Sequence, residues 1–374
     1  MSTLLDGGRE DASRRDWQHI LHIDAALLLS LLALSGLGLF VLYSAAGQDQ
    51  HVLFRQLIRL GIAYTAMILV AQLPPQWLHR WTRWLYGLGL ALLVAVLLIG
   101  DVGKGAQRWL DLGLVRFQPS EMMKLAVPMM VAWYLSDQRL PPSRSRLAIA
   151  GVLIILPVLL IAKQPDLGTA LLIGSAGFFA VFLAGLSWRL LAGLTAAAAA
   201  AAPVLWHFMH DYQRQRVITF LNPEHDPLGT GYHIIQSKIA IGSGGLFGKG
   251  WLNGTQAHLD FLPERSTDFI FAVLGEEFGL LGIGVVLTAY ALIIVRSMYI
   301  ATQAQDTFGR LLGGSLAMTF FIYLIVNTGM VTGLLPVVGL PLPLISYGGT
   351  SMVTLMAGFG ILMSIHTHRK LLPT

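Results

Sequence analysis

The sequence predicts an all-α, polytopic integral membrane protein with about ten transmembrane helices. Of the 374 residues, 55% are hydrophobic and only 12% are charged, so a water-soluble globule would expose a very large apolar surface. The apolar residues also gather in runs of about 20, which is the length of helix that crosses the hydrocarbon of a bilayer. These runs lie at 22–46, 53–72, 82–100, 119–136, 147–163, 167–185, 187–207, 268–296, 308–331 and 343–366.

No long Ser/Gly linker, charged block or internal repeat divides the chain, so we expect a single membrane domain over residues 1–374. Residues 1–21 are predicted to form a cytoplasmic N-terminal tail. Residues 208–267 are predicted to form a large extracytoplasmic loop between the seventh and eighth spans. The first apolar run has no convincing cleavage signature, and it is therefore expected to be a retained helix.

Basic residues predict which side of the membrane each connection occupies, because short cytoplasmic loops are enriched in Lys and Arg. Connections after alternate spans carry Arg80, Arg83, Arg139, Arg144, Arg146, Arg189, Arg296, Arg310, Arg369 and Lys370. We therefore expect both termini in the cytoplasm. The opposite side would then hold residues 100–118, the turn at 163–166, the long loop and the Pro-rich segment 335–343.

Several classes of function are excluded by what the sequence lacks. There is no cysteine, so a thiolate metal site or a cysteine nucleophile is not available. The net charge of +5 is scattered between apolar runs, which argues against a nucleic-acid partner. Residues 242–250 resemble a phosphate loop, but Ser243 and Gly250 stand where that loop requires Gly and Ser or Thr.

Ionisable residues inside spans indicate candidate sites, because each costs roughly 2.5–3.5 kcal/mol at a helix centre. Glu121 and Lys124 lie three residues apart, so they share a helix face and can form an ion pair. Such a pair either holds two helices together or belongs to a functional site. Lys163 and Asp166 bracket a Gln-Pro turn, which is either an ordinary solvated turn or part of the same site.

The segment before the eighth span combines a helix start with an acid. Ser266 or Thr267 is expected to cap this helix, with Asp268 in its first turn, where a carboxylate suits the helix dipole. An aspartate in this position is most often a capping residue. The neighbouring Arg265 and the many cations expected on the same side favour a catalytic role.

Five sequence blocks carry a family resemblance. They read KGAQRWLDLG, RFQPSEMMK, KQPDLGT, FLPERSTDF and GLPLPLISYGG, and they occupy 104–113, 116–124, 163–169, 261–269 and 339–349. In order and spacing, these blocks strongly resemble the SEDS (shape, elongation, division and sporulation) family, and the resemblance runs from the first span to the last. The first two blocks favour the elongation branch of that family over the division branch.

The resemblance implies a peptidoglycan glycosyltransferase of the bacterial inner membrane, active at its periplasmic face during cell elongation. Such an enzyme polymerises lipid II onto a lipid-linked glycan strand and works with a class B penicillin-binding protein, which crosslinks the product. The essential aspartate of the family matches Asp268. Other positions that its motifs mark as important match Arg55, Arg108, Arg116, Glu121, Lys124 and Asp166.

The chemistry of chain extension is consistent with these residues. The 4-hydroxyl of the acceptor sugar is a poor nucleophile until a general base takes its proton, and Asp268 is the predicted base. Direct displacement with one base predicts inversion at the anomeric carbon. The substrate also carries a polyprenyl tail, so we expect a lipid-accessible groove between helices that leads toward Asp268.

The pyrophosphate leaving group develops negative charge, which basic residues or a divalent cation (Mg or Mn) would stabilise. No organic cofactor is expected. The predicted substrate-binding residues are Arg55, Lys104, Arg108, Arg116, Lys163, Asp166 and Arg265. Glu121 and Lys124 are expected to act as a supporting ion pair.

Two other functions are compatible with the sequence. A flippase that carries lipid II across the membrane would use intramembrane charges and broken helices along its pathway. Against it, the polar residues gather on one side, and no inverted repeat is visible. A non-catalytic scaffold that activates a penicillin-binding protein is the other alternative, and only activity separates it from an enzyme.

Overall fold

The computed structural model describes residues 21–103, 106–111, 113, 116–137, 139–209, 211–222, 230–259, 261–262 and 264–368. Its helices are α2 (Ala25–Ala45), α3 (Gln50–Ala71), α4 (Pro75–Ile99), α5 (Pro119–Ser136), α6 (Arg144–Lys163), α7 (Leu167–Leu183), α8 (Trp188–Phe208), α9 (Asp211–Leu221), α10 (Thr230–Gly244), α11 (Thr255–His258), α12 (Ile270–Thr302), α13 (Thr307–Val331) and α14 (Thr350–Thr367). Three short strands, β1 (Asp101–Gly103), β2 (Ala106–Asp111) and β3 (Arg116–Phe117), pair in antiparallel order between α4 and α5.

A helix lies at each of the ten predicted spans, and the all-α membrane fold is confirmed. Within the described residues, seven helices are long and apolar enough to cross a membrane: α2, α3, α4, α6, α12, α13 and α14. Helix α7 and the part of α8 from Trp188 to Ala201 are apolar but shorter, and α5 carries a buried glutamate and lysine in its first half. The small sheet was not predicted from the sequence.

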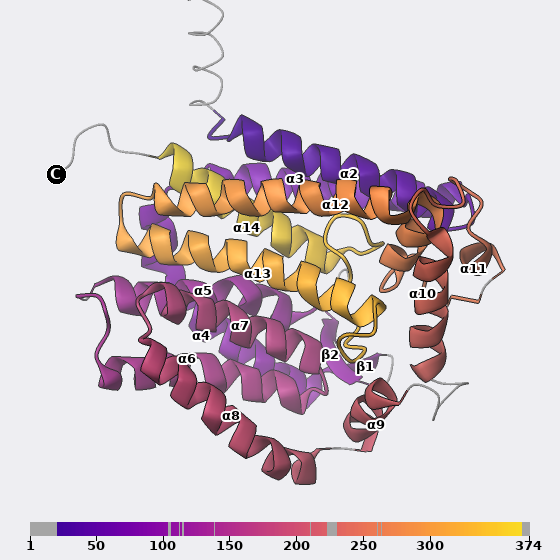
Figure 1. Cartoon of the computed structure of the whole chain (residues 1–374). Coiled ribbons are helices and arrows are strands. Elements are labelled where there is room, and N and C mark those ends of the chain that lie inside the picture. The colour runs from indigo at the N-terminus through magenta and orange to yellow at the C-terminus, as the bar shows by residue number, and fades with distance from the viewer. Residues whose placement is uncertain are drawn as a thin grey trace, which may run out of the picture.

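The predicted tenth span, 343–366, begins too early. Helix α14 starts only at Thr350, and the residues from Thr332 to Gly349 form an irregular segment. Three prolines and four glycines in this stretch prevent a regular helix, since proline lacks the amide hydrogen and glycine is conformationally free. Residues 335–349, called here the proline segment, cross the end of the bundle that carries the sheet (Figure 1) and contribute to the candidate site.

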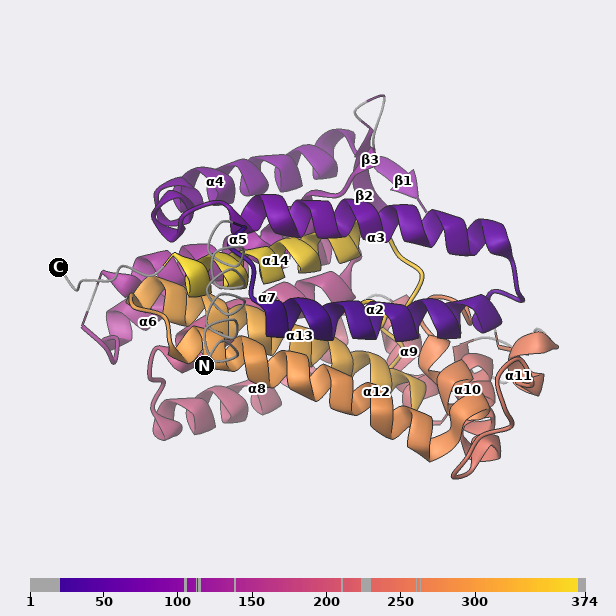
Figure 2. The same cartoon turned by 90° about the horizontal axis from the view of Figure 1, so that it is seen from above.

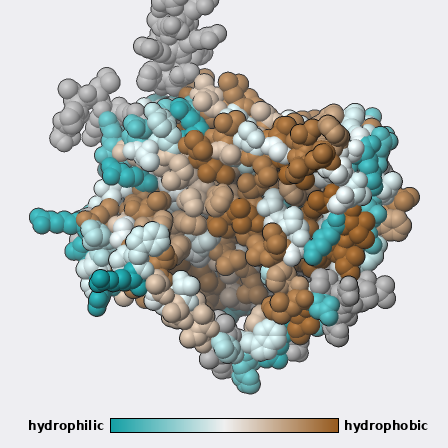
Figure 3. All heavy atoms as spheres, in the orientation of Figure 1, coloured by the Kyte–Doolittle hydropathy of each residue, from teal (hydrophilic) through white to brown (hydrophobic). Residues whose placement is uncertain are grey.

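The long helices run side by side, and α13 lies at the centre of the bundle (Figures 1 and 2). Of its apolar stretch, 72% is buried, against 17% for α6, so α6 faces outward while α13 contacts several neighbours. In the space-filling view, hydrophobic side chains cover the middle of the molecule and hydrophilic ones gather at its two ends (Figure 3). This is the distribution expected when lipid surrounds the middle of the bundle.

Helix α12 is broken near its start at Gly279, where φ is +62° and ψ is −159°. The loop after α10 inserts at this break. The amides of Lys249 and Gly250 donate to the carbonyls of Glu276 and Glu277, each at 3.0 Å. The inserted loop therefore satisfies backbone groups that the break removes from the helical hydrogen-bond ladder, as an apolar environment requires.

The first and last described residues meet at one end of the bundle. The rings of His22 and His368 stack with their centroids 3.8 Å apart, and Arg296 donates to Asp24 at 2.6 Å. Burial raises the pKa of Asp24. Hydrogen bonds from His366, Arg296 and the Leu27 amide lower this pKa by more than burial raises it, so the carboxylate stays ionised. The sheet, α10 and α11 lie at the other end (Figure 1).

Candidate active site

Asp268 lies at the end of the bundle that carries the sheet. Residues 264–269 form turns that lead into α12, and Asp268 precedes the first helical residue by two positions. The N-cap is Phe269, without a side-chain hydrogen bond, so the prediction that Ser266 or Thr267 caps this helix was wrong. The Thr267 hydroxyl instead donates to Glu264 Oε2 at 2.7 Å, and the Asp268 side chain is partly exposed.

The proline segment and α13 hold the Asp268 turn in place. The Asn327 side chain of α13 donates from Nδ2 to the Asp268 carbonyl at 2.9 Å and to the Leu340 carbonyl at 2.7 Å. The Ser346 hydroxyl donates to the Thr267 carbonyl at 2.5 Å. The Tyr347 amide donates to the Ser266 carbonyl at 2.8 Å. These bonds join three parts of the chain and fix the backbone that carries the carboxylate.

The Asp268 carboxylate lies beside the proline segment at a glycine whose backbone is left-handed. Gly339 has a φ of +77°, and a Cβ built on it would lie 3.5 Å from Asp268 Oδ2. The start of α7 packs on the same segment, because a Cβ on Gly168 would lie 2.9 Å from Val338 Cγ1. Residues 338–340 thus separate Asp268 from the first turn of α7, which begins next to Asp166.

Arg108 and Asp166 form a second polar cluster on the α7 side of this segment. Arg108, on β2, donates to the Pro165 carbonyl at 2.5 Å, and its Nε lies 3.8 Å from Asp166 Oδ2. Gln118 donates to the same carboxylate oxygen at 3.3 Å, and Asp166 Oδ1 accepts from the Thr169 amide at 3.2 Å. The predicted residues Arg108 and Asp166 are therefore brought together, with Asp166 buried as the cap of α7.

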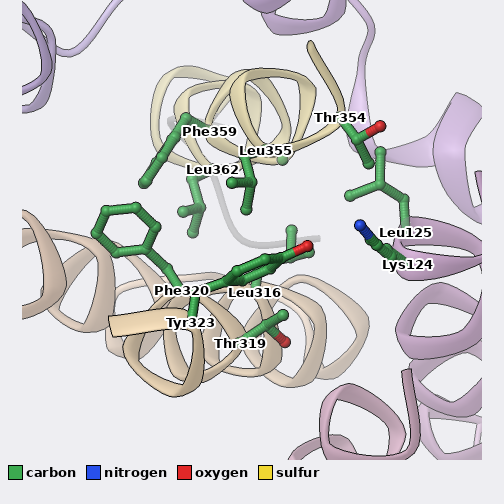
Figure 4. A pocket seen from close by; sticks show the side chains of 11 residues that line it. Lys124, Leu125, Leu316, Thr319, Phe320, Tyr323, Thr354, Leu355, Phe359 and Leu362 are labelled. Carbon is green, nitrogen blue, oxygen red and sulfur yellow. The ribbon is translucent and has the colours of Figure 1, made fainter. Parts of the chain in front are cut away.

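Glu121 and Lys124 form the predicted ion pair inside the bundle, with Lys124 Nζ 2.7 Å from Glu121 Oε1. Lys124 also donates to Ser351 of α14 at 3.3 Å and lies 5.5 Å from the ring centroid of Tyr323 on α13. The lysine and tyrosine side chains point toward each other across a small cavity of about 20 Å³ (Figure 4). That volume suits a single water molecule.

The structure does not gather every predicted cation around Asp268. Arg55 is exposed on α3 and donates to the His51 carbonyl at 3.3 Å, within its own helix. Arg265 reaches the turn between α2 and α3, 3.6 Å from a Cβ built on Gly47. Arg116 pairs only loosely with Asp111, at 3.8 Å. Lys163 is exposed at the end of α6. Lys104 lies outside the described residues.

Sequence reasoning missed three side chains near the site. Asn327 is fully buried in a span, and this polar residue in an apolar run was the available signal. Arg59 lies over the Tyr347 ring, 4.2 Å from its centroid, and adds a cation beside the proline segment. His233 of α10 stacks on Phe269 with centroids 5.6 Å apart. Burial lowers the pKa of His233, opposed by nearby Glu264, so a neutral imidazole is expected at pH 7.

Among the described residues, no three His, Asp or Glu side chains converge on a point that could hold a metal ion. Magnesium in phosphate-transfer sites commonly takes one or two carboxylates and completes its ligands with substrate phosphates and water. Asp268 is the predicted general base and must be able to accept a proton, so it is not assigned as a metal ligand. A divalent cation here would neutralise charge on the pyrophosphate and would take most of its ligands from the substrate.

The fold and the site define a class: a polytopic membrane protein with a candidate active site at one end of its helix bundle. A model of the FtsW, RodA and SpoVE family, described as cell cycle proteins, matches residues 19–371. The chain belongs to this family, as the resemblance in its five sequence blocks predicted.

Named relatives match over nearly their full length. The peptidoglycan glycosyltransferase MrdB of Escherichia coli K12 is 56% identical over 357 residues, which cover 95% of this chain and 96% of that protein. The peptidoglycan glycosyltransferase RodA of Treponema pallidum is 32% identical and covers 92% of this chain and 98% of its own. Both names agree with the activity that the resemblance implied.

Solved structures match the fold. A peptidoglycan synthase complex, whose structure concerns the coordination of polymerization and crosslinking, contains a chain with a TM-score of 0.80 and 36% identity. That match covers 92% of this chain and 97% of the other. The crystal structure of the Thermus thermophilus rod shape determining protein RodA matches with a TM-score of 0.70 and 32% identity, over 93% of this chain and 98% of that one.

An expected consequence concerns Asn327, whose amide bonds fix the Asp268 backbone. Replacing it with leucine removes both bonds but keeps the branched shape and the number of side-chain heavy atoms, so the carboxylate loses its fixed position. When glycan-strand formation from labelled lipid II is measured, we expect Asn327→Leu to lower kcat about tenfold to a hundredfold with little change in KM.

Asn327→Gln is the conservative variant and should recover part of kcat, because its amide can still donate. Thr328→Val is the matched control, since among the described residues the Thr328 hydroxyl donates only to carbonyls of its own helix, at 2.8 and 3.4 Å. If kcat is unchanged in Asn327→Leu, the side chain does not position Asp268.

Proposed function

We propose that this chain polymerises lipid II on the outer side of the bacterial inner membrane, with Asp268 as the general base. It is a glycosyltransferase of the kind its full-length relatives are named for. The observation that carries the residue assignment is the placement of Asp268: a partly exposed carboxylate on a turn held by Asn327, Ser346 and Tyr347. A fixed carboxylate near the bundle end suits proton removal from a sugar hydroxyl that arrives from outside.

In this reaction the acceptor 4-hydroxyl gives its proton to Asp268 as its oxygen attacks the anomeric carbon of the donor. The bond from that carbon to the undecaprenyl pyrophosphate oxygen breaks, and the pyrophosphate leaves with the electron pair. Attack opposite the leaving group inverts the configuration, so an α-linked donor gives a β linkage. Arg108, Arg59 and Arg265 are cations at this end of the bundle that could stabilise the leaving group.

An apolar groove supports the lipid-linked nature of the substrate. It has a volume of about 690 Å³ and lies between α6, α7, α9 and the proline segment, with Leu171, Phe178, Val217 and Val338 among its walls. Val338 precedes Gly339, against which the Asp268 carboxylate lies. The groove ends at residues 336–338 of the proline segment, next to the residue that faces Asp268. Its apolar walls suit a polyprenyl chain, which supports the expected path of the lipid tail toward the candidate base.

The partner proposed for this chain is a class B penicillin-binding protein. Its support is the matching chain in a peptidoglycan synthase complex that joins polymerization with crosslinking. The proposed orientation puts the end with His22 and His368 in the cytoplasm and the end with Asp268 in the periplasm. The arginines that follow alternate spans support this orientation.

The direct test uses the purified chain with its cognate penicillin-binding protein and labelled lipid II, and measures the length of the glycan strands formed. We expect strands from the complex, and a β linkage when they are digested. Transport of lipid II across vesicles by the same preparation, without strand formation, would support the flippase instead. Strand formation that depends entirely on another added polymerase would support a scaffold.

A bulky side chain placed in the groove should weaken binding only of substrates with a long lipid tail. Gly174 lines the groove on α7, and a Cβ there meets only Val158 at 3.5 Å. We expect Gly174→Phe to raise KM for undecaprenyl-linked lipid II about tenfold, because the ring displaces part of the tail from apolar contact. A lipid II analogue with a short prenyl chain should show no such change.

The matched control is Gly151→Phe. Gly151 lies on α6 outside the groove, with nothing within 4 Å of a built Cβ, so the same substitution there should leave KM unchanged. Equal effects of Gly174→Phe on long and short substrates would show that the groove does not hold the tail.

A further inference from the structure

A polar pocket lies at the end of the bundle opposite Asp268. Its volume is about 660 Å³, and it opens to the surface between the start of α4, the end of α5 and the start of α13. Thr307 of α13 lines this pocket, whereas Asn327, twenty residues further along the same helix, contacts the Asp268 backbone. At 1.5 Å per residue the two sites are about 30 Å apart, so the pocket is separate from the candidate active site.

The pocket presents charges of both signs. Arg80 and Arg83 of α4 are exposed along one wall, and Asp137 and Asp306 stand on the others. Within the described part of the chain, Arg80 makes no hydrogen bond or ion pair. Arg83 lies over the Trp133 ring, 5.1 Å from its centroid, and pairs with no carboxylate of the described residues.

The two carboxylates are only partly engaged by the protein. Asp137 Oδ1 is 3.8 Å from His79 Nε2, which is too long for a hydrogen bond, and the Asp137 side chain is 62% exposed. Asp306 uses Oδ1 to accept from the Gly309 amide at 3.1 Å, as the cap of α13. A ligand in the pocket therefore meets carboxylate oxygens and guanidinium groups that still have capacity for hydrogen bonds.

Tryptophans show the depth at which this pocket lies. Trp77, Trp81 and Trp84 are 53%, 49% and 72% exposed on α4, beside the two arginines. Tryptophan is enriched at the interface between hydrocarbon and water, where its ring sits at the level of the lipid headgroups. The pocket thus opens at the depth where phospholipid headgroups are found.

We propose that this pocket binds the headgroup of phosphatidylethanolamine, with Arg80 and Arg83 on its phosphate and Asp137 on its ammonium group. Both charges of this zwitterionic headgroup then meet a partner of opposite sign. An anionic lipid such as phosphatidylglycerol would also suit the arginines, but it would leave the carboxylates unmatched. The acyl chains would lie along α4 below the exposed tryptophans, in contact with its apolar surface.

The test measures lipid retention by the full chain. The purified, delipidated protein is incubated with dioleoyl-phosphatidylethanolamine or dioleoyl-phosphatidylglycerol, and bound lipid is counted by native mass spectrometry. We expect the wild type to retain the ethanolamine lipid about fivefold to tenfold more strongly, which is the net effect of one hydrogen bond at an exposed site.

Two variants separate the charges. Arg80→Gln should weaken retention of both lipids, whereas Asp137→Asn should weaken only the ethanolamine lipid and remove the preference. Arg144→Gln is the matched control, because Arg144 is exposed at the start of α6 and does not line the pocket. All three side chains are exposed, so these proteins should fold.

Equal retention of both lipids by the wild type, or equal loss in the Arg144→Gln control, would overturn the proposal. Displacement of the ethanolamine lipid from the wild type by an acidic peptide, at concentrations where phosphatidylglycerol has no effect, would also overturn it and would assign the pocket to a protein partner.

Discussion

Asp268→Asn is expected to abolish glycan polymerisation, with a loss of about 10²–10⁴ in kcat, the usual contribution of a general base. Asparagine keeps the shape of the side chain but cannot accept the hydroxyl proton. The side chain is partly exposed and the turn is held through backbone carbonyls, so the variant should fold and bind its partner as the wild type does. The measurement is strand formation from labelled lipid II with the cognate penicillin-binding protein present.

Asp268→Glu provides the companion variant. It keeps the carboxylate but moves it by one methylene, beside a proline segment on which a Cβ built at Gly339 would lie 3.5 Å from Asp268 Oδ2. We expect activity between those of the wild type and Asp268→Asn, because a misplaced base still accepts protons. Wild-type activity in Asp268→Asn would remove this residue from the mechanism. Loss of folding or partner binding in the asparagine variant would instead make it a structural residue.

Helix positions were predictable because the thickness of a bilayer fixes the length of an apolar run. The tenth span was predicted to begin at residue 343 instead of Thr350, and this error has a local cause. Leu344 and Ile345 are apolar, but they stand between Pro343 and a pair of glycines, and residue Leu344 adopts a φ of +64°. A hydropathy window cannot distinguish a buried irregular segment from a helix, because both exclude water.

The candidate site was predictable only in part. Glu121 and Lys124 were found because helical spacing alone brings residues three apart together. The approach of Gly339 to Asp268 and the bonds from Asn327 join residues that are far apart in the sequence. Such contacts depend on how whole helices pack, so a single sequence contains no local signal for them. The small sheet that carries Arg108 could not be predicted either, because its strands are only two to six residues long and leave no clear pattern in the sequence.

The buried pair gives the second large effect. Lys124→Met is expected to destabilise the protein by about 3–5 kcal/mol, because it leaves the Glu121 carboxylate buried without its ammonium partner. Lys124 is 6% exposed and Glu121 is 7% exposed, so water cannot easily compensate the lost partner. Unfolding of the purified protein in a fixed detergent or nanodisc, by heat or denaturant, measures this change.

The double variant Glu121→Gln with Lys124→Met removes both charges and should be more stable than Lys124→Met alone by about 1–4 kcal/mol. If the changes in unfolding free energy for Glu121→Gln and Lys124→Met add up to that of the double variant, the two side chains are not coupled. Polymerisation by the double variant then separates two roles that the geometry allows. Restored activity would make the pair a link between α5, α13 and α14 through Tyr323 and Ser351, at 5.5 and 3.3 Å from Lys124. Restored stability with activity still absent would place the Lys124 charge in the reaction itself, because packing without the charge would then be insufficient.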